Sequence, residues 1–207
     1  MSDETWDALR ATPLGEVRRR AAIVDRVAEV APVEVAGAQR YAWNDGGGQS
    51  AVWYFTPDDR ALLLTFDHES PLNLYAEDED TAYPLQRSFY DGVPEELLRL
   101  VRNQPENYES LNIRDPKSGD TLLYAGGVFW YDGSRWQLPE GLTGYCEREH
   151  LDLFNDSGFD YCLDTYLFGR DFTPESLVDH LAEEGWYEDE REKQEALAGI
   201  REIFARQ

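Results

Sequence analysis

The sequence predicts an α+β fold: an antiparallel sheet of about 4–6 strands, with an N-terminal helix and a helical C-terminal third packed on it. Apolar residues recur at helical spacing near the N-terminus and again after residue 143. Between about residues 39 and 140, short aromatic-rich runs separated by turn residues are typical of strands. With 207 residues, 42% of them hydrophobic, the chain can build a core, and we predict a single domain over 1–207.

The first element is a helix over about residues 12–31. Thr12 can cap it, Pro13 suits the first helical position, and Pro32 lies just past its end. One stripe of the helix is apolar and is expected to face the core; it consists of Val17, Ala21, Val24 and Ala28.

A hairpin follows in "SAVWYFTPDDRALLLTFDHES", with its turn at Asp58–Asp59. A two-residue turn would set Phe55 opposite Leu62 and Trp53 opposite Leu64. Alternation along the strands would then gather the core residues on one face, namely Trp53, Phe55, Leu62, Leu64 and Phe66.

Residues 70–92 carry the least pattern. They include the acidic run "AEDED", which we expect in an exposed loop over 76–82. A short helix over 94–103 should follow, begun by Pro94, with two glutamates near its positive N-terminus.

The stretch "GGVFWYDGSRWQL" predicts a second hairpin, because an Asp-Gly pair is a strong turn signal. With Asp132–Gly133 as the loop, Trp130 would lie opposite Arg135, which suggests a cation–π pair on a partly exposed surface. The opposite face would be core, formed by Phe129, Tyr131, Trp136 and Leu138. A one-residue shift would exchange the faces. Two interpretations therefore stay open for Trp130: a core residue or a contact site for a partner.

The C-terminal part, about 143–206, is predicted to be helical. In "DFTPESLVDHLAEEGW", Thr173 is the expected N-cap, Pro174 the first residue and Gly185 the end, with Trp186 folding back in a Schellman-type contact. A last helix should run from about 188 to 205, and its inward stripe would be Leu197, Ile200 and Phe204.

Net charge is the most unusual property of the chain. The formal charge is −23, from 42 acidic and 19 basic residues. Residues 1–40 are nearly neutral, with 7 acids and 6 bases, so almost all of the excess lies in the rest of the chain. Such a surface repels nucleic acid and anionic membranes and attracts a basic partner over a distance. It also raises solubility, and it suits a salt-rich cytoplasm.

Cysteine usage and the absence of a targeting signal indicate the compartment. Neither a run of about 20 apolar residues nor an apolar signal core is found in the sequence, which predicts a cytoplasmic protein without a membrane segment. Cys146 and Cys162 are expected to be reduced and buried. The scarcity of lysine, with two against 17 arginines, is typical of high-GC bacterial or haloarchaeal genomes.

Motifs for catalysis are mostly absent. The sequence has no phosphate-binding loop, no G-x-S-x-G elbow, no C-x-x-C pair and no H-E-x-x-H. We therefore predict neither a cofactor nor a metal, and the chain is more typical of a non-enzyme. Each of the three histidines follows or precedes an acid. His68 with Asp67 and Glu69 is the one candidate for an acid–base site, because alternation places His68 on the core face at a strand end.

Three functions are compatible with these observations. The first is an acidic protein-binding module, of the immunity or antitoxin type, that neutralises a basic partner such as a toxin. The second is a housekeeping or scaffold domain whose acidity serves only solubility or salt adaptation. The third is an enzyme built around His68. The residues predicted to contact a partner are Glu77, Asp78, Glu79, Asp80, Trp130 and Arg135.

Overall fold

The fold was analysed in a computed structural model that describes residues 3–74, 77–107 and 111–206. It belongs to the predicted α+β class, with an N-terminal helix, a six-stranded antiparallel sheet and helices in the C-terminal part. The chain divides into two compact units. The sheet unit is Pro32–Cys162, and the helical unit combines Met1–Ala31 with Leu163–Gln207. That the chain forms one domain stays a prediction.

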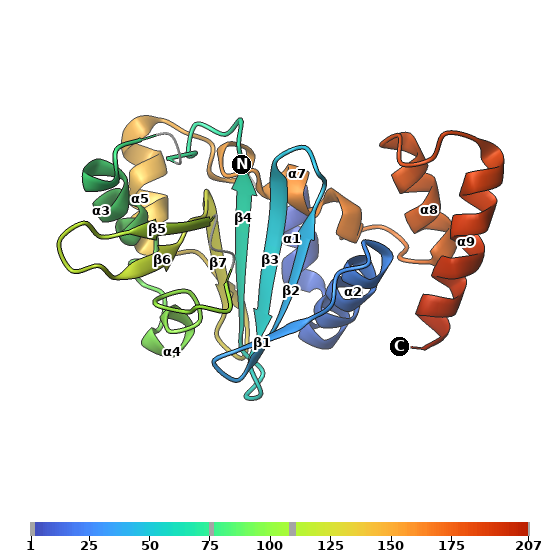
Figure 1. The fold of residues 1–207 in the computed structure, drawn as a ribbon, viewed down its shortest axis with the longest axis horizontal. Helices are drawn as coiled ribbons and strands as arrows, with labels where there is room; N and C mark the ends of the chain where they lie inside the picture. The colour runs from blue at the N-terminus through green and yellow to red at the C-terminus, as the bar shows by residue number, and fades with distance from the viewer. Residues whose placement is uncertain (1–2, 75–76, 108–110, 207) are drawn as a thin grey trace. The chain divides into compact units, whose positions relative to one another are not determined.

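The sheet unit is built on strands in the order β1-β2-β3-β4-β7-β8, each antiparallel to its neighbours (Figure 1). Their bounds are Val33–Val35 (β1), Ala38–Asn44 (β2), Gln49–Phe55 (β3), Ala61–Asp67 (β4), Gly127–Tyr131 (β7) and Trp136–Gln137 (β8). Every residue of β3 is buried, so both faces of the sheet are covered at its centre. This explains why β3 is apolar on both faces.

The predicted register of the β3–β4 hairpin was wrong by one residue. Its loop has three residues, not two, because the Thr56 amide donates to the Arg60 carbonyl at 3.0 Å and Asp59 adopts a left-handed φ of 58°. Phe55 therefore pairs with Ala61, and Val52 with Leu64. The shift divides the expected core residues between the two faces. Four of them are still at most 2% exposed, Trp53, Phe55, Leu62 and Leu64, whereas Phe66 is half-buried.

The β7–β8 hairpin turns one residue later than predicted. The carboxylate of Asp132 accepts hydrogen bonds from the Ser134 and Arg135 amides, at 2.8 and 2.9 Å, which makes Gly133–Ser134 the centre of the turn. Trp130 consequently lies opposite Gln137 and not opposite Arg135. Its pairing with Arg135 was therefore wrong. The partner strand moves by two residues, so the core face keeps its members, and Phe129 and Trp136 are buried.

Between β4 and β7 the chain forms the elements that surround the candidate site. These are α3 (Glu79–Phe89), α4 (Glu95–Leu98) and a two-stranded sheet of β5 (Asn112–Arg114) and β6 (Thr121–Leu123). Of the loop predicted over 76–82, residue 76 lies outside the described residues, and Glu77 and Asp78 precede α3. The prediction was wrong for 79–82, which begin the helix, where the helix dipole favours carboxylates. The helix predicted over 94–103 is only one turn long. The helix α5 (Glu140–Glu149) packs beside α3 (Figure 1).

Two short helices follow, α6 (Leu153–Asp156) and α7 (Phe159–Leu163). Leu163, the last residue of α7, is the first residue of the second segment of the helical unit. The expected state of the cysteines is confirmed: Cys146 and Cys162 are free and buried. Burial raises the pKa of Cys146 to about 11 and that of Cys162 to about 12, so both stay protonated thiols at neutral pH.

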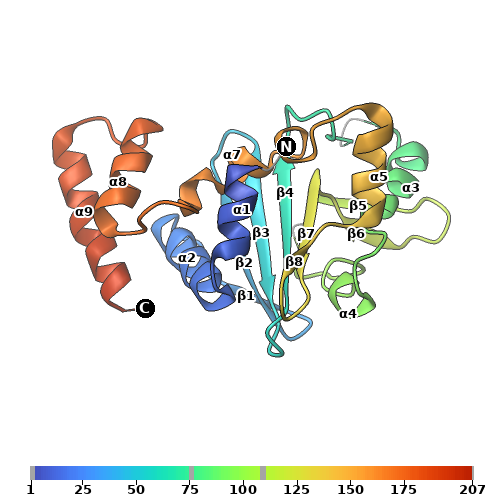
Figure 2. The same ribbon diagram turned by 180° about the vertical axis from the view of Figure 1, so that it is seen from behind.

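The helix predicted over about 12–31 is present as the second helix of the helical unit, and a first helix that was not predicted precedes it. These are α1 (Glu4–Ala11) and α2 (Leu14–Val27). Thr12 ends α1 by donating its hydroxyl proton to the Ala8 carbonyl at 2.8 Å, so it does not cap α2. The unit continues with the short 3₁₀ helix η2 (Asp164–Tyr166), α8 (Pro174–Glu183) and α9 (Glu190–Ala205). Figure 2 shows α8 and α9 as a side-by-side pair.

The boundaries predicted for α8 are confirmed. The Thr173 hydroxyl accepts from the Ser176 amide at 3.1 Å, and Pro174 is the first helical residue. At the other end Gly185 has a φ of 80°, and the Trp186 amide donates to the Leu181 carbonyl at 3.0 Å, as in a Schellman motif. In the described part of the chain, no helix combines the length and apolar character needed to cross a bilayer.

Candidate functional site

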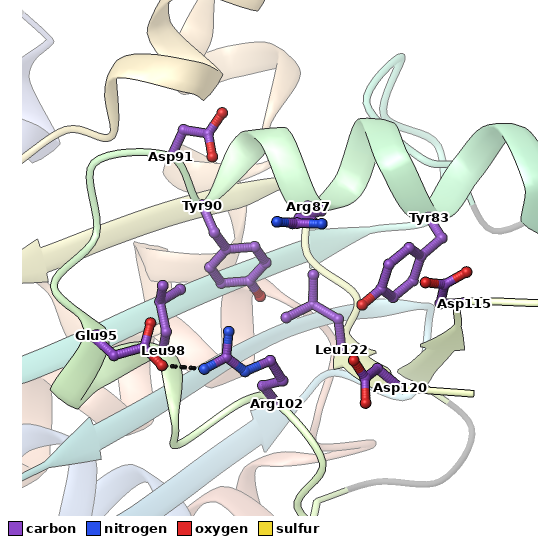
Figure 3. A pocket seen from close by; sticks show the side chains of 10 residues that line it. All are labelled: Tyr83, Arg87, Tyr90, Asp91, Glu95, Leu98, Arg102, Asp115, Asp120 and Leu122. Atoms are coloured by element: carbon purple, nitrogen blue, oxygen red, sulfur yellow. Dashed lines mark hydrogen bonds and ion pairs between the residues drawn. The ribbon is translucent and has the colours of Figure 1, made fainter. Parts of the chain in front are cut away.

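A pocket of about 290 Å³ opens in the sheet unit between α3, α4 and the β5–β6 hairpin (Figure 3). We call it the tyrosine pocket. Its lining combines two tyrosines, two leucines, four acids and two arginines. The volume is at the lower end of the roughly 300–1,000 Å³ that is usual for small-molecule sites. It therefore suits one side chain or a small polar ligand.

The helix α3 supplies one wall through a single stripe of residues. Tyr83, Arg87 and Tyr90 are spaced by four and three positions, which places them on the same helical face. Tyr90 is 3% exposed and donates its hydroxyl proton to the Leu123 carbonyl of β6 at 2.7 Å. Burial raises the pKa of Tyr90 well above its ordinary value, so it remains a donor that ties α3 to the hairpin.

Tyr83 differs from Tyr90 in its hydroxyl. Its side chain is also buried, with 7% of the residue exposed, but its hydroxyl makes no hydrogen bond to any of the residues that the structure describes. Figure 3 shows the ring between Asp115 and Asp120, with the hydroxyl directed into the pocket. Burial and these two carboxylates raise the pKa of Tyr83. A protonated phenol that has no hydrogen bond to a described residue is therefore available to a ligand in a negative environment.

The two carboxylates are fixed by the loop that joins β5 to β6. The Asp115 amide donates to the Asp120 carbonyl at 2.8 Å and closes the loop. One carboxylate oxygen of Asp115 accepts from the Lys117 amide at 2.9 Å, and the other accepts from the Ser118 hydroxyl at 2.8 Å. These donors lower the pKa of Asp115, which therefore keeps its charge in mild acid.

Asp120 is held from outside the loop. Its Oδ1 accepts a hydrogen bond from the Asn103 side-chain amide at 3.1 Å, while the Asn103 backbone amide donates to the Thr121 carbonyl at 3.0 Å. Asn103 adopts a left-handed φ of 55°, a conformation that asparagine tolerates better than most residues. Neutral donors thus hold both carboxylates at the acidic end of the pocket in place.

The two arginines that line the pocket differ in whether they form an ion pair. Arg102 is paired with Glu95, so its charge is compensated. Arg87 is exposed, and among the described residues it has neither an ion pair nor a hydrogen bond. It is therefore the one lining arginine whose charge would act on a ligand directly.

A shallower depression of about 140 Å³ continues the pocket along α3, sharing Tyr83, Arg87 and Asp115 with it. It is also lined by Asp80, which belongs to the acidic run predicted to contact a partner. Asp78 precedes α3 as its N-cap residue and is exposed, as is Glu77. The side chain of Glu79 lies outside the described part of the structure. The last residue of the acidic run, Asp80, therefore lies beside the tyrosine pocket.

The other two predicted partner contacts lie elsewhere, and neither lines the pocket. Trp130 is half-buried on β7, packs against the core, and has its indole nitrogen buried. Arg135 is exposed in the β7–β8 turn, 4.0 Å from Asp132. Their contact with a partner stays a prediction.

The candidate acid–base group around His68 is not enclosed. The expectation that His68 lies on the core face was wrong, because β4 ends at Asp67 and the His68 side chain is 49% exposed. Asp67 accepts from the Gln49 side chain at 3.0 Å, and Glu69 lies 3.9 Å from the imidazole. None of these three residues lines the tyrosine pocket.

Sequence reasoning did not find the pocket residues. The spacing of Tyr83, Arg87 and Tyr90 on α3 was the available signal, but Pro84 interrupts the helical pattern there. Within the described ranges, the side chains that could hold a metal ion are Asp164, His180 and Glu184, in the helical unit. Among known proteins, no family model matches the chain, and no curated protein or solved structure is significantly similar to it.

Proposed function

We propose that the chain is an acidic protein-binding module, of the immunity or antitoxin type, and that its tyrosine pocket receives an arginine or lysine side chain of a basic partner. The observation that carries this proposal is the Tyr83 hydroxyl, which has no hydrogen bond to a described residue and points into the pocket near Asp115 and Asp120. A phenol oxygen and two carboxylates all accept hydrogen bonds, and guanidinium and ammonium groups are donors without acceptors.

The partner would be guided to the pocket by charge. The formal charge of −23 attracts a cationic protein before contact, and the acidic run beside the pocket concentrates the attraction near the site. Affinity would come from the desolvated end of the pocket, where a charged donor meets acceptors that are held in place. The small volume fits a side chain that projects from a larger surface.

The experiment uses arginine methyl ester and lysine methyl ester as probes, with binding followed by NMR through the backbone amides of residues 83, 115 and 120, which every variant retains. We expect saturable shifts, and an affinity loss of roughly ten- to hundredfold in Tyr83→Phe, because a hydrogen bond to a charged group contributes about 1.5–3 kcal/mol. Asp120→Asn should also weaken binding, since it removes charge but retains the oxygen that Asn103 contacts. Asp58→Asn, at the exposed β3–β4 turn, is the matched control.

Arg87→Gln distinguishes a cationic ligand from an anionic one. If the pocket binds a guanidinium or ammonium group, removing the uncompensated charge of Arg87 should tighten binding. If the pocket is an anion site, the same change should abolish binding. Equal affinity of the probes for the wild type, Tyr83→Phe and Asp120→Asn would contradict the proposal. Such a result would favour the interpretation that the acidity serves only solubility.

A further inference from the structure

We propose that the helical unit contains a binding site for a divalent transition-metal ion, formed by Asp164, His180 and Glu184. One ligand atom from each of the three side chains lies within 4.8 Å of the other two. Imidazole nitrogen and carboxylate oxygen are ligands of Zn²⁺, and three protein ligands leave a fourth position for water. This site is independent of the tyrosine pocket, which belongs to the sheet unit.

The surroundings of the His180 imidazole indicate a ligand. The residue is 6% exposed, and its imidazole makes no hydrogen bond to any residue in the described part of the chain. Its Nδ1 faces the Asp164 carboxylate, with 3.8 Å between Nδ1 and Oδ2. That separation is too long for a hydrogen bond but close to the distance of roughly 3.4 Å between two ligand atoms of a tetrahedral ion with bonds of about 2.0–2.2 Å.

Asp164 is oriented for this role by Arg170. The Arg170 guanidinium donates to Oδ1 at 2.8 Å, which leaves Oδ2 directed toward His180. A hydrogen bond to the second oxygen of a ligating carboxylate is a common way to fix its orientation. Two carboxylates and one guanidinium leave the group with a net charge of −1 when the imidazole is neutral, so a dication is attracted.

The last turn of α8 and its C-cap residue supply the other two ligands. Glu184 follows His180 by four positions, and residues at that spacing share one helical face. Its exposed side chain can move the short distance that coordination requires. The acid next to His180 in the sequence, Asp179, is already neutralised by Lys193 at 2.7 Å. The structure therefore selects Glu184, and not the sequence neighbour, as the third ligand.

A histidine ligand favours Zn²⁺ over Mg²⁺, which prefers oxygen ligands and retains its water. The test is calorimetric titration of the full chain with Zn²⁺ in an excess of Mg²⁺, which occupies nonspecific carboxylate sites. We expect one site whose dissociation constant rises at least about tenfold in both Asp164→Asn and Glu184→Gln. Glu183→Gln, one exposed residue away on α8, is the matched control and should bind as the wild type does.

A second measurement does not depend on any variant. The His180 ring resonances of the wild-type chain should shift on addition of Zn²⁺, before those of the exposed His68. Zn²⁺ binding that is absent, that is fully suppressed by Mg²⁺, or that keeps its affinity in both Asp164→Asn and Glu184→Gln would overturn the assignment. So would a His180 ring that does not respond to saturating Zn²⁺.

Discussion

The two pocket tyrosines provide the sharpest prediction, because the same substitution should have opposite consequences at each. Tyr90→Phe removes a buried hydroxyl that donates to the Leu123 carbonyl at 2.7 Å. The carbonyl loses that donor in a dry environment, which costs about 1–3 kcal/mol. Tyr83→Phe removes a hydroxyl with no hydrogen bond to a described residue. We expect its free energy of unfolding to stay within about 0.5 kcal/mol of the wild-type value.

Urea denaturation of the two variants measures this difference directly, and thermal melting provides a second scale. For a chain of this length, 1 kcal/mol corresponds to roughly 2–4 °C in melting temperature. The melting temperature of Tyr90→Phe should therefore be several degrees below that of the wild type. The melting temperature of Tyr83→Phe should equal the wild-type value. In the binding experiment the order should reverse: Tyr83→Phe loses affinity for the arginine probe, and folded Tyr90→Phe retains most of it.

Equal destabilisation of Tyr83→Phe and Tyr90→Phe would contradict this prediction. Such a result would show that the Tyr83 hydroxyl has an internal structural partner, and the acceptor group proposed for a cationic side chain would no longer be available. Equal loss of probe affinity in both variants would likewise point to distortion of the pocket and not to loss of one hydrogen bond.

Three further predictions concern the core, the acidic run and alkaline pH. Leu64→Ala should cost roughly 2–5 kcal/mol in urea denaturation, because Leu64 is 2% exposed between Val52 and Val128; an unchanged midpoint would contradict the β3–β4–β7 register. Neutralising Glu77, Asp78, Glu79 and Asp80 together should slow association with a basic partner and flatten its salt dependence in surface-based kinetics, whereas an association rate that ignores salt would exclude steering. Burial raises the pKa of Cys162 from 9.0 to about 12, so its contribution to stability is present below pH 9 and is lost as pH rises toward 12, by at most about 1.4 kcal/mol per pH unit. Cys162→Ala should make that decline shallower in denaturation curves across the range, and an identical slope would show that other groups cause it.

Features that depend on neighbouring residues were predictable from the sequence. The boundaries of α8 follow from Thr173, Pro174 and Gly185, because capping hydrogen bonds and a left-handed glycine act within a few residues. The α+β class followed from hydrophobic periodicity for the same reason. The burial of both cysteines followed from cysteine usage, because free cysteines are among the most buried residues. Register was less accessible, since one extra residue in the loop before Arg60 exchanges the faces of β4 without changing its composition.

The candidate sites were decided by tertiary structure alone. Tyr83 meets Asp115 and Asp120 only because α3 packs against a hairpin that begins at Asn112, and no local pattern encodes that approach. In the same way His180 faces Asp164 and Glu184 instead of the adjacent Asp179, whose charge is taken by Lys193. The sequence shows that carboxylates are abundant, because 42 of its residues are acidic. Which of them remain uncompensated beside a buried polar group depends on packing, because desolvation and hydrogen bonding act between residues that the fold brings together.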